Sequence, residues 1–73
     1  QQNQVDEAIR TFRINTKLYP DSWNVYDSLG EALLRAGDTD DAAAMYEKSL
    51  TLNPESPTGK EALKNIKEGA ATM

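Results

Sequence analysis

Several residue types that carry chemistry are missing from this chain of 73 residues. It contains neither cysteine nor histidine. Without cysteine there is no disulfide and no thiolate metal ligand, and without histidine there is neither an imidazole base nor the commonest metal ligand. We therefore expect no catalytic residues, no cofactor-binding residues and no metal site, and we predict that the chain is not an enzyme.

Positive charge and long apolar runs are also scarce. Eight Lys and Arg stand against twelve Asp and Glu, a net charge of -4. A protein that binds a phosphate backbone needs clustered cations, so nucleic acid is not an expected partner. No apolar run approaches the roughly 18 residues that suggest a membrane span. Nothing resembles a signal peptide, but Gln1 looks like a point inside a longer chain. Cytoplasm and periplasm both remain open.

What the chain does contain is a helical pattern of apolar residues on either side of Gly37-Asp38. Its positions are Tyr26, Leu29, Gly30 and Leu33 before this break, and Ala42, Tyr46, Leu50, Leu52 and Pro54 after it. This spacing resembles the tetratricopeptide repeat, a pair of antiparallel helices that stacks into a solenoid. The resemblance implies an all-α fold, an antiparallel helix-turn-helix solenoid fragment of about four helices.

The repeat recurs within the chain at the period of about 34 residues that this family shows. Counted back by that period, the second-helix positions become Ala8, Phe12, Leu18 and Pro20. Counted forward, Leu29 maps to Leu63, but Gly30 maps to Lys64. A lysine in that slot is typical of a solvating end cap.

These matches predict a single domain with four parts. Residues 4–20 form the second helix of a partial repeat, 21–54 a complete repeat, 56–68 a capping helix and 69–73 a frayed tail. Asp21 or Ser22, Asp38 and Ser56 are the expected helix caps. Gly30 lies within a helix, where glycine costs about 0.5–1 kcal/mol relative to alanine. We therefore expect a neighbouring helix to cross closely there, with Ala8 and Ala42 as the small residues at such contacts.

The resemblance also predicts where a partner would bind. In this family the first helix of each pair lines a concave face that usually holds partner peptides. The residues next to the apolar stripe on the helix surface, one residue or about 100° away from it, should line this face, and the same positions recur 34 residues later. The predicted groove residues are Asn24, Asp27, Glu31, Leu34, Arg35, Glu61 and Asn65, with Thr58, Glu68 and Gly69 beside them. Members that clamp a C-terminal carboxylate place Lys or Arg with Asn here, so the acidic residues do not support that clamp. A peptide site and an ordinary solvated face both remain open.

Two further features concern contacts with other proteins. Trp23, the only tryptophan, either packs on the turn formed by Tyr19 and Pro20 or serves as an anchor in an interface. Val5, Ile9 and Phe12 belong to the second half of a repeat whose first half would precede Asn3. We expect this face to have lost its natural cover, which makes it a possible association face of a homodimer.

The residues from Thr16 to Ala32 are similar to the C-terminal tails of bacterial serine hydrolases of the beta-lactamase and penicillin-binding-protein-like class, and of some esterases. In such a protein the nucleophile would lie upstream, and the Ser-x-x-Lys motif is absent here. Two hypotheses follow. The chain is a protein-interaction or scaffolding module that contacts a protein, a peptide or its own parent domain. Alternatively, it is an appendage of a hydrolase whose catalytic domain lies upstream.

Overall fold

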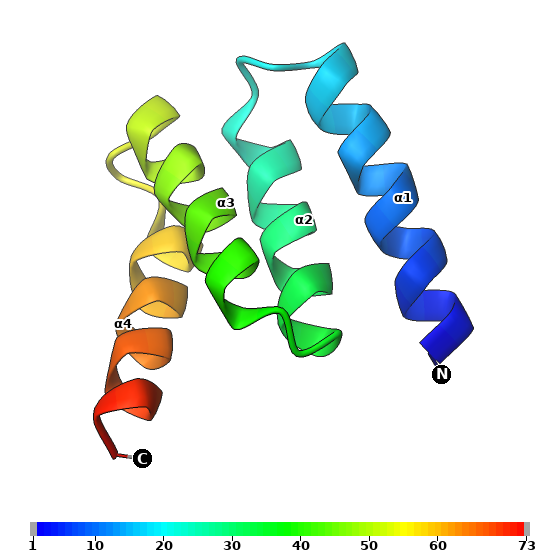
Figure 1. The fold of residues 1–73 in the computed structure, drawn as a ribbon. Coiled ribbons are helices and arrows are strands. Elements are labelled where there is room, and N and C mark those ends of the chain that lie inside the picture. The colour runs from blue at the N-terminus through cyan, green and yellow to red at the C-terminus, as the bar shows by residue number, and fades with distance from the viewer. Residues whose placement is uncertain (1, 73) are drawn as a thin grey trace.

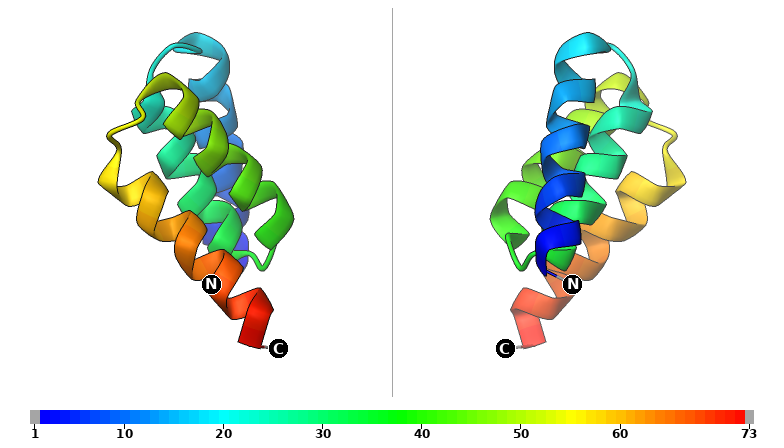
Figure 2. Two further views of the ribbon diagram at one scale, coloured as in Figure 1. Left: turned by 90° about the vertical axis from the view of Figure 1, so that its left-hand side faces the viewer. Right: turned by 90° about the vertical axis from the view of Figure 1, so that its right-hand side faces the viewer.

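The computed structural model describes residues 2–72, and within them the side chains of residues 4–69. This range folds into four helices: α1 (Gln2–Leu18), α2 (Trp23–Arg35), α3 (Thr39–Leu52) and α4 (Pro57–Thr72). They alternate in direction and lie side by side in chain order (Figure 1). Packing joins α1 to α2, α2 to α3 and α3 to α4, and Figure 2 shows the stack from its α4 side and from its α1 side. The predicted all-α fold of about four helices is confirmed.

The core lies between the two central helices. Leu29 and Leu33 from α2, with Ala42 and Tyr46 from α3, form its buried cluster. Partly buried residues from the outer helices pack against it: Ile9 and Phe12 of α1, and Ala62, Leu63 and Ile66 of α4. The apolar stripes read from the sequence therefore face one another, because residues three and four apart share one helix face.

The end of α2 is fixed by Gly37. Its φ of 87° is a left-handed conformation that glycine adopts freely. The Asp38 amide donates to the Leu33 carbonyl at 2.9 Å, and the Gly37 amide donates to the Leu34 carbonyl at 3.0 Å. This pair of bonds is a Schellman motif, which satisfies two carbonyls that the helix leaves unpaired at its end.

The helix starts follow the sequence less closely. Ser56 caps α4, since its Oγ accepts a hydrogen bond of 3.2 Å from the Gly59 amide. Ser22 and Asp38 hold the N-cap positions of α2 and α3, but neither side chain makes a cap hydrogen bond. The predicted cap positions are therefore correct at Ser22 and Asp38, but the side-chain hydrogen bond that a cap usually makes is missing at both. At Asp38 the reason lies in the backbone, because its ψ of 70° is outside the extended conformation typical of a cap.

The bounds of both outer helices differ from those that the sequence predicted. Helix α1 begins at Gln2, so its first turn carries no acidic residue. Helix α4 continues to Thr72, although residues 69–73 were expected to fray. Ala70 and Ala71 have the highest intrinsic helix propensity, which favours this extension. Met73 lies outside the described residues.

Gly30 makes the close approach that its place within a helix predicted, but with a different partner. A Cβ atom at this position would lie 2.9 Å from Tyr46 Cε2 and 3.0 Å from Tyr46 Cζ. The surface opposite Gly30 is therefore an aromatic ring, not the small side chain of Ala8 or Ala42. A ring reaches much further across the helix interface than a methyl group, so only a residue without a side chain fits beside it.

Ser49 provides the first testable prediction. Its side chain is fully buried in α3, and within the described part of the chain its Oγ has no hydrogen-bond partner. Burying an unpaired hydroxyl costs about 1–3 kcal/mol, and alanine is also the better helix former. We expect Ser49→Ala to raise the free energy of unfolding by about 1–2 kcal/mol in urea denaturation.

Thr51→Ala is the matched control for this prediction. The Thr51 hydroxyl is exposed and donates to the Glu47 carbonyl at 3.0 Å, so its loss should change stability by at most about 0.5 kcal/mol. A decrease in stability on Ser49→Ala would contradict the prediction and would show that the buried hydroxyl has a bound partner such as water.

Candidate functional site

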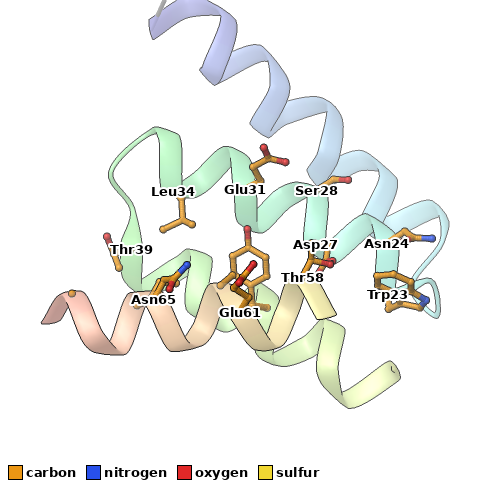
Figure 3. A pocket seen from close by; sticks show the side chains of 14 residues that line it. Trp23, Asn24, Asp27, Ser28, Glu31, Leu34, Thr39, Thr58, Glu61 and Asn65 are labelled. Carbon is orange, nitrogen blue, oxygen red and sulfur yellow. The ribbon is translucent and has the colours of Figure 1, made fainter. Parts of the chain in front are cut away.

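A groove of about 1050 Å³ lies between α2 and α4. We refer to it as the α2–α4 groove. Helix α2 contributes Trp23, Asn24, Asp27, Ser28, Glu31 and Leu34, and α4 contributes Thr58, Glu61, Ala62, Asn65, Ile66 and Gly69. Thr39 and Tyr46 of α3 complete the lining. Figure 3 shows Trp23 and Asn24 at one end of the groove and Thr39 and Asn65 at the other.

The structure brings most of the predicted groove residues together. Those that line the groove are Asn24, Asp27, Glu31, Leu34, Glu61 and Asn65, with Thr58 and Gly69 beside them. Arg35 is not among the lining residues. It follows Leu34 by one helical step of about 100°, which turns it toward α1. There it lines a smaller hollow of about 370 Å³ together with Val5 and Phe12. Glu68 also lies outside the lining.

A hydrogen bond crosses the groove at one end. Thr58 Oγ1 of α4 donates to Asp27 Oδ2 of α2 at 2.5 Å, and the two side chains are labelled together in Figure 3. The other carboxylate oxygen, Asp27 Oδ1, is shielded from solvent and has no hydrogen-bond partner within the described residues. Asp27 is therefore held in place with part of its negative charge uncompensated.

Tyr46 connects the core to the groove. Its ring is buried against Gly30, and it also lines the groove. Burial raises the pKa of the Tyr46 hydroxyl above its ordinary value of about 10, and the negative charges of Glu31 and Asp27 raise it further. The negative charges of Glu31 and Asp27 are therefore both felt at the Tyr46 hydroxyl.

The raised pKa of Tyr46 gives a prediction for alkaline solution. The folded chain holds this proton more tightly than the unfolded chain does. The contribution of the protonated Tyr46 to the free energy of unfolding is therefore fully present below about pH 10. It is lost as the pH rises from there through the folded pKa. We expect Tyr46 to titrate above pH 10 when its ring-carbon NMR shift is followed, and we expect Glu31→Gln to lower that midpoint. A midpoint at or below the ordinary value would contradict this.

The charge of the lining is of one sign. Asp27, Glu31 and Glu61 contribute carboxylates, and the lining residues include neither Lys nor Arg. Arg35 lies 3.1 Å from the Glu31 carboxylate, but both side chains are largely exposed to water. Exposed pairs of this kind are weak because water screens them. The groove therefore remains acidic, as the sequence indicated.

Two aromatic residues of the groove were not predicted there. Trp23 precedes Asp27 by four residues and so shares its helix face, which is a signal that the spacing could have shown. Tyr46 was assigned to the core alone. Its second position in the groove depends on how far the ring reaches between helices, which spacing along one helix does not report.

Among the residues described, no group of three or more acidic side chains is placed to hold a metal ion. None of the helices within residues 2–72 has the length and apolar character needed to cross a bilayer. What the groove offers is a mixture of apolar surface, amide groups and carboxylates.

The predicted association face is partly covered. Val5, Ile9 and Phe12 are half-buried, and Ile9 and Phe12 pack against the core. The large apolar side chains that α1 leaves exposed are Ile14 and Leu18, which are 52% and 64% exposed. Leu18 was expected to face inward, but it is the last residue of α1 and nothing in the following turn covers it. Self-association stays a prediction.

Known proteins contain a segment that matches this chain. The chain is 38% identical over 65 residues to the Hsp70-Hsp90 organizing protein of Triticum aestivum, which covers 89% of this chain and 11% of that protein. It is 30% identical over 59 residues to protein arginine N-methyltransferase 9 of Homo sapiens, which covers 81% of this chain and 7% of that protein. The chain thus spans only a small part of the length of the curated relatives it matches.

A protein-family model also matches this chain directly. The family model described as tetratricopeptide repeat matches residues 23–66. This range contains all of α2 and α3 and most of α4, the helices that form the groove. The chain therefore belongs to the tetratricopeptide repeat family.

Proposed function

We propose that this chain is a non-enzymatic interaction module that holds a segment of a partner protein in the α2–α4 groove. Membership of the tetratricopeptide repeat family supports contact with proteins. The observation that carries the site is the groove itself, a hollow of about 1050 Å³ on the face formed by α2 and α4. This is the face on which related repeats usually hold peptides.

The chemistry of the groove suits an extended segment. Asn24 and Asn65 lie toward opposite ends (Figure 3), and a side-chain amide can both donate to and accept from a peptide backbone. Trp23 and Ile66 add apolar surface to the lining of the same groove. A segment that runs along the groove would therefore find backbone partners and places for apolar side chains.

The names of the relatives support this proposal in part. The wheat protein is named as an organizer of Hsp70 and Hsp90, which favours a protein partner for this chain as well. A segment that ends in a carboxylate is not the proposed ligand, because no Lys or Arg lines the groove to receive it.

An accessory segment of a larger enzyme is the second hypothesis. One relative is named as a methyltransferase, and the residues from Thr16 to Ala32 resemble tails of serine hydrolases. The hydrolase form of this hypothesis has no support from the relatives described above. In either case the groove would contact the parent's own domain or another protein.

A peptide-display library selected against the chain would test the proposed function. We expect selected peptides to change the fluorescence of Trp23, which lines the groove and is the only tryptophan. Amide NMR shifts should change along α2 and α4. Changes confined to the outer surface of α1 around Ile14 and Leu18 would show that partners bind elsewhere, and would overturn the proposed site.

A further inference from the structure

The charge of the α2–α4 groove is the feature that distinguishes it from a neutral peptide groove. Its three carboxylates come from both walls, Asp27 and Glu31 from α2 and Glu61 from α4. The chain as a whole carries a net charge of -4, so the surrounding field has the same sign. A complementary partner segment must therefore bring positive charge.

Asp27 is the carboxylate with the strongest reason to attract a cation. Its Oδ2 accepts from Thr58, but its Oδ1 is shielded from water and has no hydrogen-bond partner in the described chain. A negative charge that has lost solvent on one side gains more from a nearby cation than a fully hydrated one.

The apolar part of the lining suits the stems of long cationic side chains. Ala62 and Ile66 lie on the α4 wall, and the rings of Trp23 and Tyr46 are also in the lining. Lys and Arg bury their methylene groups on such surfaces while the charged group stays near water or a carboxylate. Aromatic faces attract the same cations.

Taking the proposed function as its basis, we propose that the α2–α4 groove binds a basic peptide segment, with Lys or Arg side chains directed at Asp27, Glu31 and Glu61. A bound metal ion is a poorer occupant, since no group of three or more carboxylates among the described residues is placed to hold one. A free polyamine would satisfy the charge but would leave Asn24 and Asn65 without backbone partners.

Binding of three synthetic peptides of equal length would test this proposal. In the first, arginine alternates with alanine and leucine; in the second and third, glutamine or glutamate replaces arginine. None contains an aromatic residue, so Trp23 fluorescence reports the groove alone. We expect the arginine peptide to bind at least about tenfold more tightly than the glutamine peptide, with affinity falling as salt increases. The glutamate peptide should not bind.

Variants of the chain separate the groove from its overall charge. Glu31→Gln with Glu61→Gln removes two groove carboxylates and should weaken arginine-peptide binding at least about tenfold. Asp6→Asn with Glu47→Gln removes the same charge from exposed positions outside the groove, and should change affinity less than about twofold. Circular dichroism melting would establish that both double variants fold like the parent chain.

The outcomes distinguish this inference from the proposed function. Equal binding of the arginine and glutamine peptides would overturn the preference for a basic segment while leaving a peptide groove intact. Equal losses in the two double variants, or a fluorescence change of equal affinity with spermidine, would also overturn it. If no peptide alters Trp23 fluorescence or the α2 and α4 amides, both the inference and the proposed function fail.

Discussion

Replacing Gly30 by leucine is expected to lower the free energy of unfolding by about 1–3 kcal/mol, which is a large part of the stability available to a chain of this size. A Cβ atom alone would lie 2.9 Å from the Tyr46 ring, and leucine adds three further carbons in the same direction. Overpacking of a core costs about 1–3 kcal/mol, whereas a core in a domain of this size rarely supplies more than about 3–5 kcal/mol. Urea or thermal unfolding followed by circular dichroism would measure the loss.

Two matched substitutions separate packing from helix propensity. If helix propensity were the only effect, Gly30→Ala would raise the free energy of unfolding by about 1 kcal/mol. We expect it to lower that free energy instead, because the Tyr46 ring must move to make room for the added Cβ atom. Gly69→Ala should be neutral or stabilising, since a Cβ there would meet no atom within 4 Å among the described residues. Lys64→Leu, in the slot that corresponds to Gly30 in the cap, is exposed and should be tolerated. If Gly30→Leu melts no lower than Lys64→Leu, the register between α2 and α3 is wrong.

The sequence predicted the fold where a short-range pattern determines it. Leu29, Leu33, Ala42 and Tyr46 were placed in the core from their spacing, because helical periodicity reports which face of each helix is buried. Gly37 was recognised in the sequence as part of the break between two helices, and it has a left-handed conformation that few other residues adopt. These features depend on neighbours within a few turns of the chain.

The parts that were missed depend on contacts between helices. Asp27 and Thr58 are separated by 31 positions, and no local pattern reports that their side chains meet. Arg35 was assigned to the groove by counting steps, but its place beside α1 depends on how α1 crosses α2. Leu18 was predicted to be inside because Leu52 occupies the same slot. Leu18 is 64% exposed at the end of α1, whereas Leu52 is partly buried at the end of α3. The two leucines differ because other parts of the chain cover the end of α3 but not the end of α1.

Replacing Phe12 gives the final prediction, because the sequence and the structure predict different effects of this substitution. From the sequence, Phe12→Asp should disrupt a homodimer. In the structure Phe12 packs against the core and occupies the α1 slot that Tyr46 occupies in α3. We therefore expect Phe12→Asp to lower the free energy of unfolding by about 3 kcal/mol, near the lower end for truncating a core phenylalanine because this side chain is only partly buried.

Leu18→Asp combined with Ile14→Asp is the control that leaves the core in place. Both side chains are mostly exposed, so the free energy of unfolding should change by no more than about 0.5 kcal/mol per site. If the chain pairs with a second copy at high concentration, these substitutions should abolish the pairing in sedimentation, because they remove the exposed apolar surface of α1. A strict monomer at millimolar concentration would contradict self-association. Unchanged stability in Phe12→Asp would contradict the packing of α1 on the core, and would return Phe12 to the free surface that its place in the sequence predicted.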